Sequence, residues 1–532
     1  MNTLSLQNVS YYILEKSKKK KIPILKNLNL ELNGGKLTAI IGTSGSGKTS
    51  LLNIIGGRVE SGIIEGIVRY NGKKRVPAEY KKIVSFVEQE LMLLSSLTVK
   101  ETLSFTTNLF HSLTELKKEE QEELTNTFLS HFKLNDIEKS RIGSVSKRGI
   151  SGGEKKRAVI ASKLITKPKI LILDEPTTGL DSSSTHHIVS LLKKATQMFN
   201  LITISSIHQP SQETFLLFDQ VIITSSYGIV YCGPTDKVAE YFDSLGYYCP
   251  EFENPVDYYL SVITHISGTE KQELGCSTRI KKIVDSWQRN PLLFSDSQST
   301  ENINSTSSNL NNSVNLPSFQ HASSQTNVDI AQICPNSVRY SLGEPIVETD
   351  DTHKWPNTSF QEFKIILKRS WTIQIREPEL IYSYLFMSTF AGLVLGFTYY
   401  NTNTLNKIQN TTGITFLCCL YLLFLVALPL MLILDEKKRY FAYERSYRMY
   451  RVSSFFFALM FTILPIILIS NFIMMIETYF LAKFQLVFYN CFSYSGTSFR
   501  YTTAYTCFTF NIWWEFNQPQ LNSASYIMDK IS

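Results

Sequence analysis

Cysteine is sparse and unpaired in this sequence, which limits the kinds of domain that it can form. The chain has 532 residues and eight cysteines, and none of the cysteines shows the C-x-x-C spacing typical of zinc or redox sites. This argues against a disulfide-stabilised secreted module and favours scattered reduced thiols in an intracellular domain. The cysteines are residues 232, 249, 276, 334, 418, 419, 491 and 507.

Two further absences concern targeting and charge. Residues 1–10 contain no basic segment followed by an apolar run, so the sequence predicts no cleavable signal peptide. The formal net charge of +7 is modest and spread along the chain, and it does not indicate a nucleic-acid partner. Apolar residues make up 43% of the sequence, enough for a large core, and the length suits about two or three domains.

The first region, residues 1–265, has the pattern of an α/β domain. Short apolar or β-branched runs alternate with helical stretches, which predicts buried parallel strands with helices on both faces of the sheet. The runs are Leu37–Ile41, Ile170–Leu173, Leu201–Ile207 and Val221–Thr224. Residues 266–352 are largely rich in Ser, Asn, Thr and Gln, so we expect a disordered linker there. A regulatory phosphorylation segment is the alternative interpretation of this linker.

The region 353–482 holds the long apolar runs. Residues 380–400 and 412–434 contain no charged side chain, and residues 452–480 contain one, Glu477. A helix needs about 20 apolar residues to cross the hydrocarbon core, so the sequence predicts a partial transmembrane domain of about three helices. Buried core helices of a soluble domain are the alternative. Too little polar sequence surrounds the three runs to support it.

Basic residues predict how these spans are oriented. They gather before the first run and between the second and third runs, whereas residues 401–411 contain only Lys407. The positive-inside rule then places the first region and the 435–451 loop in the cytoplasm of a multi-pass membrane protein. The basic residues on the cytoplasmic side are Lys364, Lys368, Arg369, Arg376, Lys437, Lys438, Arg439, Arg445, Arg448 and Arg451.

The most specific motif is a phosphate-binding loop between a predicted strand and a predicted helix. Its glycines let backbone N–H groups face one anion, and the helix N-terminus adds partial positive charge. The lysine should reach the β- and γ-phosphates of a nucleotide, and the hydroxyl of Thr49 should bind Mg²⁺. The loop is Gly42-Thr43-Ser44-Gly45-Ser46-Gly47-Lys48-Thr49.

An acidic pair follows the apolar run 170–173. We expect Asp174 to hold Mg²⁺, directly or through water, and Glu175 to polarise the attacking water, because hydrolysis at the γ-phosphate needs a positioned acceptor. Two weaker candidates also follow predicted strands. Gln89 could reach Mg²⁺ and the water, and His208 could contact the γ-phosphate. Tyr11 either stacks on adenine or packs in the core.

A second candidate anion site precedes another helix. Ser151, Gly152 and Gly153 leave backbone N–H groups open at a helix N-terminus. One domain seldom needs two γ-phosphate sites that face different ways. The pattern therefore predicts head-to-tail pairing, in which each of two domains offers this segment to the nucleotide of the other.

These motifs, in this order, resemble the G subfamily of ATP-binding cassette transporters, which are half transporters. The resemblance covers about 1–265 and 355–482 and rests on residues 150–157, 174–181, 206–211, 254–259 and 444–451. It implies a P-loop NTPase domain, with a RecA-like core and a helical subdomain, followed by an all-α transmembrane domain. It also implies that Asp181 links two ATP sites, that 360–376 is a connecting helix and that 435–451 is a coupling loop.

The implied activity is ATP hydrolysis, with ATP and Mg²⁺, coupled to export of lipid, sterol or another amphipathic cargo. The implied partners are a second half transporter and membrane lipid. The family has six spans, and we count three here, followed by a polar and aromatic tail, 483–532, that is atypical. The alternative function is therefore a truncated, non-transporting subunit that regulates full-length relatives. A soluble cassette ATPase fits less well, because such proteins generally carry two cassettes and no spans.

Overall fold

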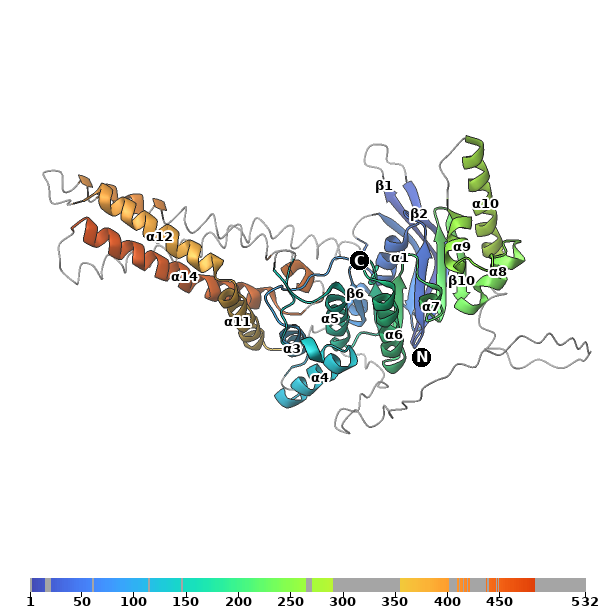
Figure 1. The fold of residues 1–532 in the computed structure, drawn as a ribbon, viewed down its shortest axis with the longest axis horizontal. Helices are drawn as coiled ribbons and strands as arrows, with labels where there is room; N and C mark the ends of the chain where they lie inside the picture. Colours follow the sequence, from blue (N-terminus) through green and yellow to red (C-terminus); the bar gives the residue numbers. More distant parts are fainter. Residues whose placement is uncertain are drawn as a thin grey trace, which may run out of the picture.

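The chain folds into a cassette domain and an elongated helical part that extends away from it (Figure 1). The computed structural model describes residues 2–14, 21–59, 62–112, 115–144, 147–264, 270–289 and 355–400, short stretches between 409 and 447, and residues 449–483.

The central sheet of the cassette has six strands in the order β10-β9-β3-β8-β7-β6. Neighbours from β9 through β6 pair in parallel, while β10 closes the edge antiparallel to β9. Every residue of β3, β6, β7 and β8 is buried, because α1, α5 and α6 pack on the sheet. The strands are β3 (Leu37–Gly42), β6 (Val84–Val87), β7 (Ile170–Leu173), β8 (Ile202–Ser206), β9 (Gln220–Ser225) and β10 (Gly228–Pro234). The predicted buried parallel strands are confirmed.

A second sheet is antiparallel, in the order β2-β1-β4-β5. Alternate residues of β1 and β2 point inward, so that Leu4, Leu6, Leu28, Leu30 and Leu32 are buried in the cassette core. The strands are β1 (Thr3–Leu14), β2 (Lys21–Asn33), β4 (Ile63–Tyr70) and β5 (Lys73–Lys74), and α2 (Pro77–Ile83) leads from this sheet to β6. This sheet carries Tyr11 toward the nucleotide-binding edge.

Three helices form the predicted helical subdomain. α3 packs against both α4 and α5, and a short 3-10 helix follows α4. A capping box between Thr98 and Glu101 starts α3, and a second between Ser151 and Glu154 starts α5, which explains why both helices begin where they do. The elements are α3 (Val99–Phe110), α4 (Lys118–His131), η1 (Asn135–Ile137) and α5 (Gly152–Ile165).

The end of the cassette departs from the sequence-based prediction. The disordered linker predicted from residue 266 is wrong for residues 270–289, which form α10 (Glu270–Arg289). Apolar residues at helical spacing, Ile280, Ile283, Val284 and Trp287, are buried there, with Trp287 5.1 Å from the ring of Tyr231. Composition averaged over the long polar stretch hid this short amphipathic period. Residues 290–354 lie outside the described part of the chain.

The remaining cassette elements connect the sheet to α10. They are α1 (Lys48–Gly56), α6 (Ser182–Met198), α7 (Gln212–Phe215), η2 (Thr235–Lys237), α8 (Val238–Ser244) and α9 (Pro255–Ile263). α9 begins at Asn254, whose side chain accepts from the N–H of Val256, with Pro255 in the first turn.

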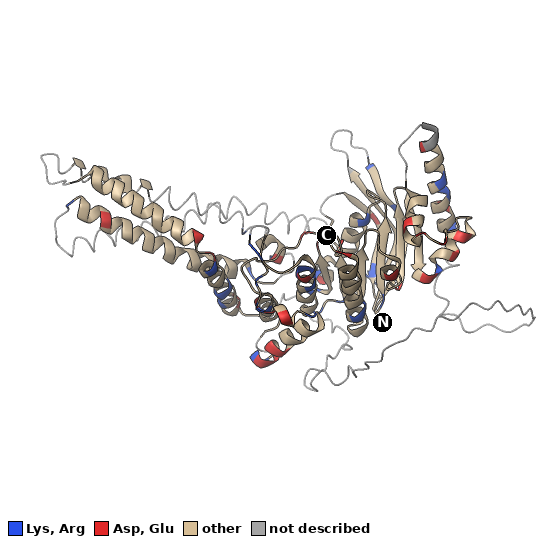
Figure 2. Cartoon of the chain, viewed as in Figure 1, with Lys and Arg blue, Asp and Glu red and all other residues tan. Residues whose placement is uncertain are grey.

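Beyond the cassette, α11 (Ser359–Arg376) leads to α12 (Glu379–Thr398), which lies alongside α14 (Val452–Leu481) (Figure 1). Both α12 and α14 are long and apolar enough to cross a membrane. Figure 2 shows almost no charged residue along them, whereas charges gather on α11 and on the cassette. They match the first and third predicted spans. Most of the second, 412–434, and the tail after Lys483 lie outside the described residues.

Candidate nucleotide site

Topology brings the predicted site residues to one edge of the central sheet. The strands β3, β8, β7 and β6 are consecutive neighbours that run in parallel, so their carboxyl ends share this edge. The phosphate-binding loop follows β3, His208 follows β8, and the pair Asp174-Glu175 follows β7. Gln89 lies just beyond β6. Four motifs that are far apart in the sequence thus lie side by side at the carboxyl ends of neighbouring strands.

The phosphate-binding loop has the backbone shape that an anion site requires. Gly45 and Gly47 adopt φ values of 76° and 88°, in the left-handed region that favours glycine, and Gly47 caps the N-terminus of α1. Ser46 fixes the loop against the sheet through a 2.9 Å hydrogen bond between its Oγ and that of Thr224. The loop therefore presents the N-terminus of α1, with its free N–H groups, toward the edge of the sheet.

Lys48 is held inside this loop. Its Nζ donates to the carbonyl oxygens of Gly42 at 2.9 Å and Thr43 at 3.1 Å, and the side chain is only 8% exposed. Burial lowers the pKa of Lys48, while Glu175 and Asp174 act in the opposite direction. An ammonium group in this position faces the acidic pair across the space where phosphates would lie.

The acidic pair is organised by Ser206, a residue of β8 to which the sequence analysis assigned no role in the site. Its hydroxyl donates to Asp174 Oδ1 at 2.8 Å and accepts from the backbone N–H of Glu175 at 2.7 Å. Burial raises the pKa of Asp174, whereas hydrogen bonds from Ser206 and Thr49 lower it. The role of this buried serine could not be predicted from the sequence, because its partner Asp174 is 32 residues away.

Glu175 contacts one other predicted site residue, Gln89, and also Thr178. Its Oε2 accepts from Gln89 Nε2 at 3.1 Å and from Thr178 Oγ1 at 3.0 Å. Its φ of 46° lies in the left-handed region, where a non-glycine residue is strained. Such strain tends to occur at functional sites.

The residues present fit a magnesium nucleotide. A cleft of about 430 Å³ is lined by Thr49, Gln89 and Asp174, among others. Hydroxyl, amide and carboxylate oxygens are the ligands that Mg²⁺ prefers, and the N-terminus of α1 supplies donors for phosphate oxygens. Tyr11 also lines this cleft, but its ring is only 7% exposed within the core, which favours the packing alternative over stacking on adenine. His208 is exposed at the same edge of the sheet.

The second anion segment does not join the first. Among the described residues, no hydrogen bond connects Ser151, Gly152 or Gly153 to the phosphate-binding loop. Ser151 and Gly152 are exposed at the start of α5, and Gly153 packs near Leu180, the residue before Asp181. Asp181 caps α6 by accepting from the N–H of Ser184 at 2.8 Å. Together they form a separate, outward-facing surface.

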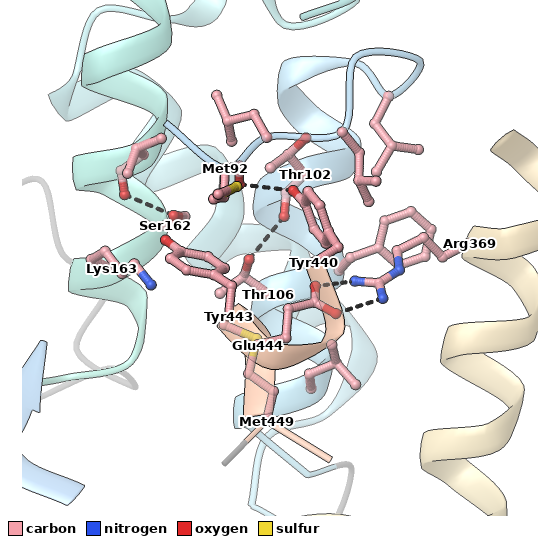
Figure 3. Close-up of a pocket in the computed structure, with 16 residues that line it drawn as sticks. Met92, Thr102, Thr106, Ser162, Lys163, Arg369, Tyr440, Tyr443, Glu444 and Met449 are labelled. Carbon is pink, nitrogen blue, oxygen red and sulfur yellow. Dashed lines mark hydrogen bonds and ion pairs between the residues drawn. The ribbon is translucent and has the colours of Figure 1, made fainter. Parts of the chain in front are cut away.

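The cassette also makes an interface with the helical part, and it includes the 435–451 loop that the family resemblance implied is a coupling loop. A small cavity of about 50 Å³ lies between α3, α5, α11 and the 435–451 loop. Figure 3 shows the side chains that line it, with Arg369 bonded to Glu444 at its side. Arg376 at the end of α11 pairs with Glu101 of α3 at 2.6 Å. These ion pairs join residues at least 75 positions apart, so local sequence patterns cannot predict which side chains pair.

Comparisons with known proteins agree with this arrangement. The family described as ABC transporter matches residues 25–178, and the family described as ABC-2 type transporter matches residues 361–516. The second match includes much of the tail that composition set apart as atypical.

Several transporters are similar along most of the chain. The broad substrate specificity ATP-binding cassette transporter ABCG2 of Bos taurus is 32% identical over 90% of this chain and 70% of its own length. The Rattus norvegicus protein of that name is 31% identical over 86% and 66%. ABC transporter G family member 22 of Dictyostelium discoideum is 31% identical over 86% and 68%. The chain thus spans about two thirds of the length of these relatives.

The cassette at the sheet edge, the membrane-domain match and these relatives lead to one conclusion: the chain belongs to the G subfamily of ATP-binding cassette half transporters, membrane proteins that couple ATP hydrolysis to transport.

Proposed function

We propose that the chain is an ATP-hydrolysing half-subunit that moves lipid, sterol or another amphipathic substrate across a membrane as a dimer. The observation that carries the proposal is the cluster at the sheet edge, where Gln89 is hydrogen-bonded to Glu175 beside Asp174 and Lys48. This cluster combines a cation for phosphate, an acidic residue for Mg²⁺ and a carboxylate for water.

The residues divide the chemistry between them. Bound ATP·Mg²⁺ supplies the phosphoanhydride bond and the metal charge that its cleavage requires. Lys48 and the N-terminus of α1 would bind the phosphates, and Thr49 and Asp174 would hold the metal. Glu175 accepts a hydrogen bond from the attacking water, and Gln89 orients the Glu175 carboxylate. His208, at the end of the neighbouring strand, contacts the γ-phosphate.

The membrane part supports an amphipathic cargo. α12 and α14 present apolar and aromatic side chains, including the exposed Phe386, Phe390 and Phe461. The name of the ABCG2 relatives describes broad substrate specificity. We infer a similar preference for apolar molecules here, with the cassette in the cytoplasm, as the basic residues predict. The truncated, non-transporting alternative is not favoured, because the membrane-family match continues to residue 516.

Substitution of Glu175 tests the proposal. Glu175→Gln keeps the size of the side chain and removes its charge, so ATP should still bind while hydrolysis falls by about 10²-fold or more. The measurement is ATPase activity of the full chain in lipid nanodiscs, with binding of a fluorescent ATP analogue followed in parallel. Glu240→Gln, an exposed glutamate on α8, is the matched control and should leave both unchanged. Unchanged hydrolysis in Glu175→Gln would refute the proposed chemistry.

A further inference from the structure

Lys163, in the last turn of α5, is buried without a hydrogen-bond partner among the described residues. The side chain is 2% exposed. Its Nζ lies 3.1 Å from the ring centre of Tyr447 and 4.3 Å from that of Tyr443, both in the 435–451 loop. Ammonium groups are attracted to the faces of aromatic rings, most strongly where water is excluded. The two tyrosines thus provide the contacts that offset the burial of this charge.

The charged groups around Lys163 come from several elements. Arg58 follows α1, Glu88 follows β6 and Glu444 lies in the loop, and all three act on the charge of Lys163. Arg58 pairs with Glu88 at 2.8 Å and stacks on Tyr447 at 5.0 Å. Burial and the nearby Arg58 lower the pKa of Lys163 well below its usual value. The carboxylates of Glu88 and Glu444 oppose this shift, and the rings of Tyr443 and Tyr447 also favour the charged form of Lys163.

Tyr447 also holds the strand that leads to the nucleotide site. Its hydroxyl donates to the carbonyl oxygen of Phe86 in β6 at 2.5 Å. Three residues later, Gln89 donates to Glu175. The tyrosine therefore contacts two separate elements, the end of α5 through Lys163 and β6 through Phe86.

The two elements lead to different nucleotide segments. β6 leads to Gln89, in the site of this chain. α5 begins at Ser151-Gly152-Gly153, the exposed segment predicted to meet the nucleotide of a second subunit. Because a helix is stiff along its axis, a displacement at its first turn is carried to Lys163 in its last turn.

We propose that Lys163 is a positioning residue that clamps Tyr443 and Tyr447, so that the 435–451 loop responds to α5 and β6 together. The inference rests on the proposed function for its use in transport. The clamp itself is a property of the described contacts, and it can be measured without any transported substrate.

Hydrogen exchange of the loop amides in the full chain, in lipid nanodiscs, tests the clamp. Lys163→Met keeps a long side chain and removes the charge, and the loop amides should exchange about tenfold faster, as expected for loss of a desolvated cation–π contact. The change in loop exchange that a non-hydrolysable ATP analogue with Mg²⁺ produces in the wild type should also be lost, with analogue binding retained. Lys163→Arg, which keeps a cation, should preserve both properties, and Lys194→Met, an exposed lysine of α6, should have no effect.

Fluorinated tyrosines at position 443 separate ring electronics from shape. Each added fluorine weakens the attraction of the ring for a cation. In a chain with Lys163, the exchange rate of the loop amides should therefore increase with the number of fluorines. In Lys163→Met the rate should not depend on that number. Equal or slower loop exchange in Lys163→Met, or steps that persist in it, would overturn the proposal. If the wild type binds no ATP analogue, the proposed function fails, and the nucleotide-free exchange rates still decide whether the clamp exists.

Discussion

At the residue scale, the hydroxyl of Ser206 is hydrogen-bonded to both residues of the acidic pair, to the side chain of Asp174 and to the backbone of Glu175. It donates to the Asp174 carboxylate and accepts from the Glu175 backbone, so it links the residue proposed to bind Mg²⁺ to the residue proposed to orient the attacking water. Because Asp174 is buried, each hydrogen bond that it accepts favours its charged form, which is the form that binds Mg²⁺.

Ser206→Ala should shift the pH dependence of metal binding. Removing the hydrogen bond raises the pKa of Asp174 above its already raised value, so protonation competes with Mg²⁺ at higher pH. We expect Mg²⁺-dependent ATP hydrolysis in the variant to decline at a higher pH than in the wild type as the pH is lowered. Rates measured between about pH 5 and pH 8 check this, with Ser205→Ala on the same strand as the control. An unshifted acid limb would contradict the role given to Ser206.

At the element scale, α11 and the 435–451 loop are joined by a buried ion pair. Arg369 donates to both carboxylate oxygens of Glu444, at 2.5 Å and 2.8 Å, and Tyr450 hydroxyl also bonds to Glu444. Both charged side chains are nearly inaccessible. The pair fixes the connecting helix against the loop, and Arg376 with Glu101 fixes the same helix against α3.

Arg369→Met should destabilise this junction by about 3–5 kcal/mol, because it leaves the Glu444 charge buried without its partner. The double variant Arg369→Met/Glu444→Leu removes both charges and should recover much of the loss. Denaturant unfolding of the purified chain, followed by the fluorescence of Trp355 and Trp371, measures both effects. Lys368→Met, an exposed neighbour on α11, is the control. A double variant no more stable than Arg369→Met would show that the charge pair is not the cause.

At the scale of the whole molecule, the surface formed by Ser151, Gly152 and Asp181 is separate from the nucleotide cleft of the same chain. The N-terminus of α5 attracts anions, and it is exposed there. Head-to-tail pairing of two cassettes would close each cleft with this surface from the other chain.

Complementation between two differently tagged chains tests this pairing. When Lys48→Ala and Ser151→Arg lie on opposite chains of a dimer, one site keeps both Lys48 and Ser151, and about half of the wild-type ATPase should remain if the sites act independently. When both changes lie on one chain of the dimer, each shared site carries one defect and activity should be lost. The reverse pattern would mean that each cassette completes its own site.

Much of the cassette could be predicted from local sequence. The strand Ile170–Leu173 has the predicted bounds, because a run of four apolar residues is long enough for a buried strand and too short for a helix. The phosphate-binding loop could also be predicted, because two of its glycines, Gly45 and Gly47, adopt positive φ values that other residues rarely reach. By contrast, α10 was missed, since four buried residues spread over a polar segment give a weak signal.

The sequence by itself determined the family motifs, the short apolar runs that form buried strands and the long apolar runs that can cross a membrane. Each of these depends only on residues within one element. Only the tertiary structure decided which motifs meet. Parallel pairing of β3, β8, β7 and β6 brings Gln89 to Glu175, and the packing of α5 against the 435–451 loop buries Lys163 beneath two tyrosines. Such contacts depend on side chains distant in the sequence, whose geometry is set by the packing of whole elements rather than by local preference.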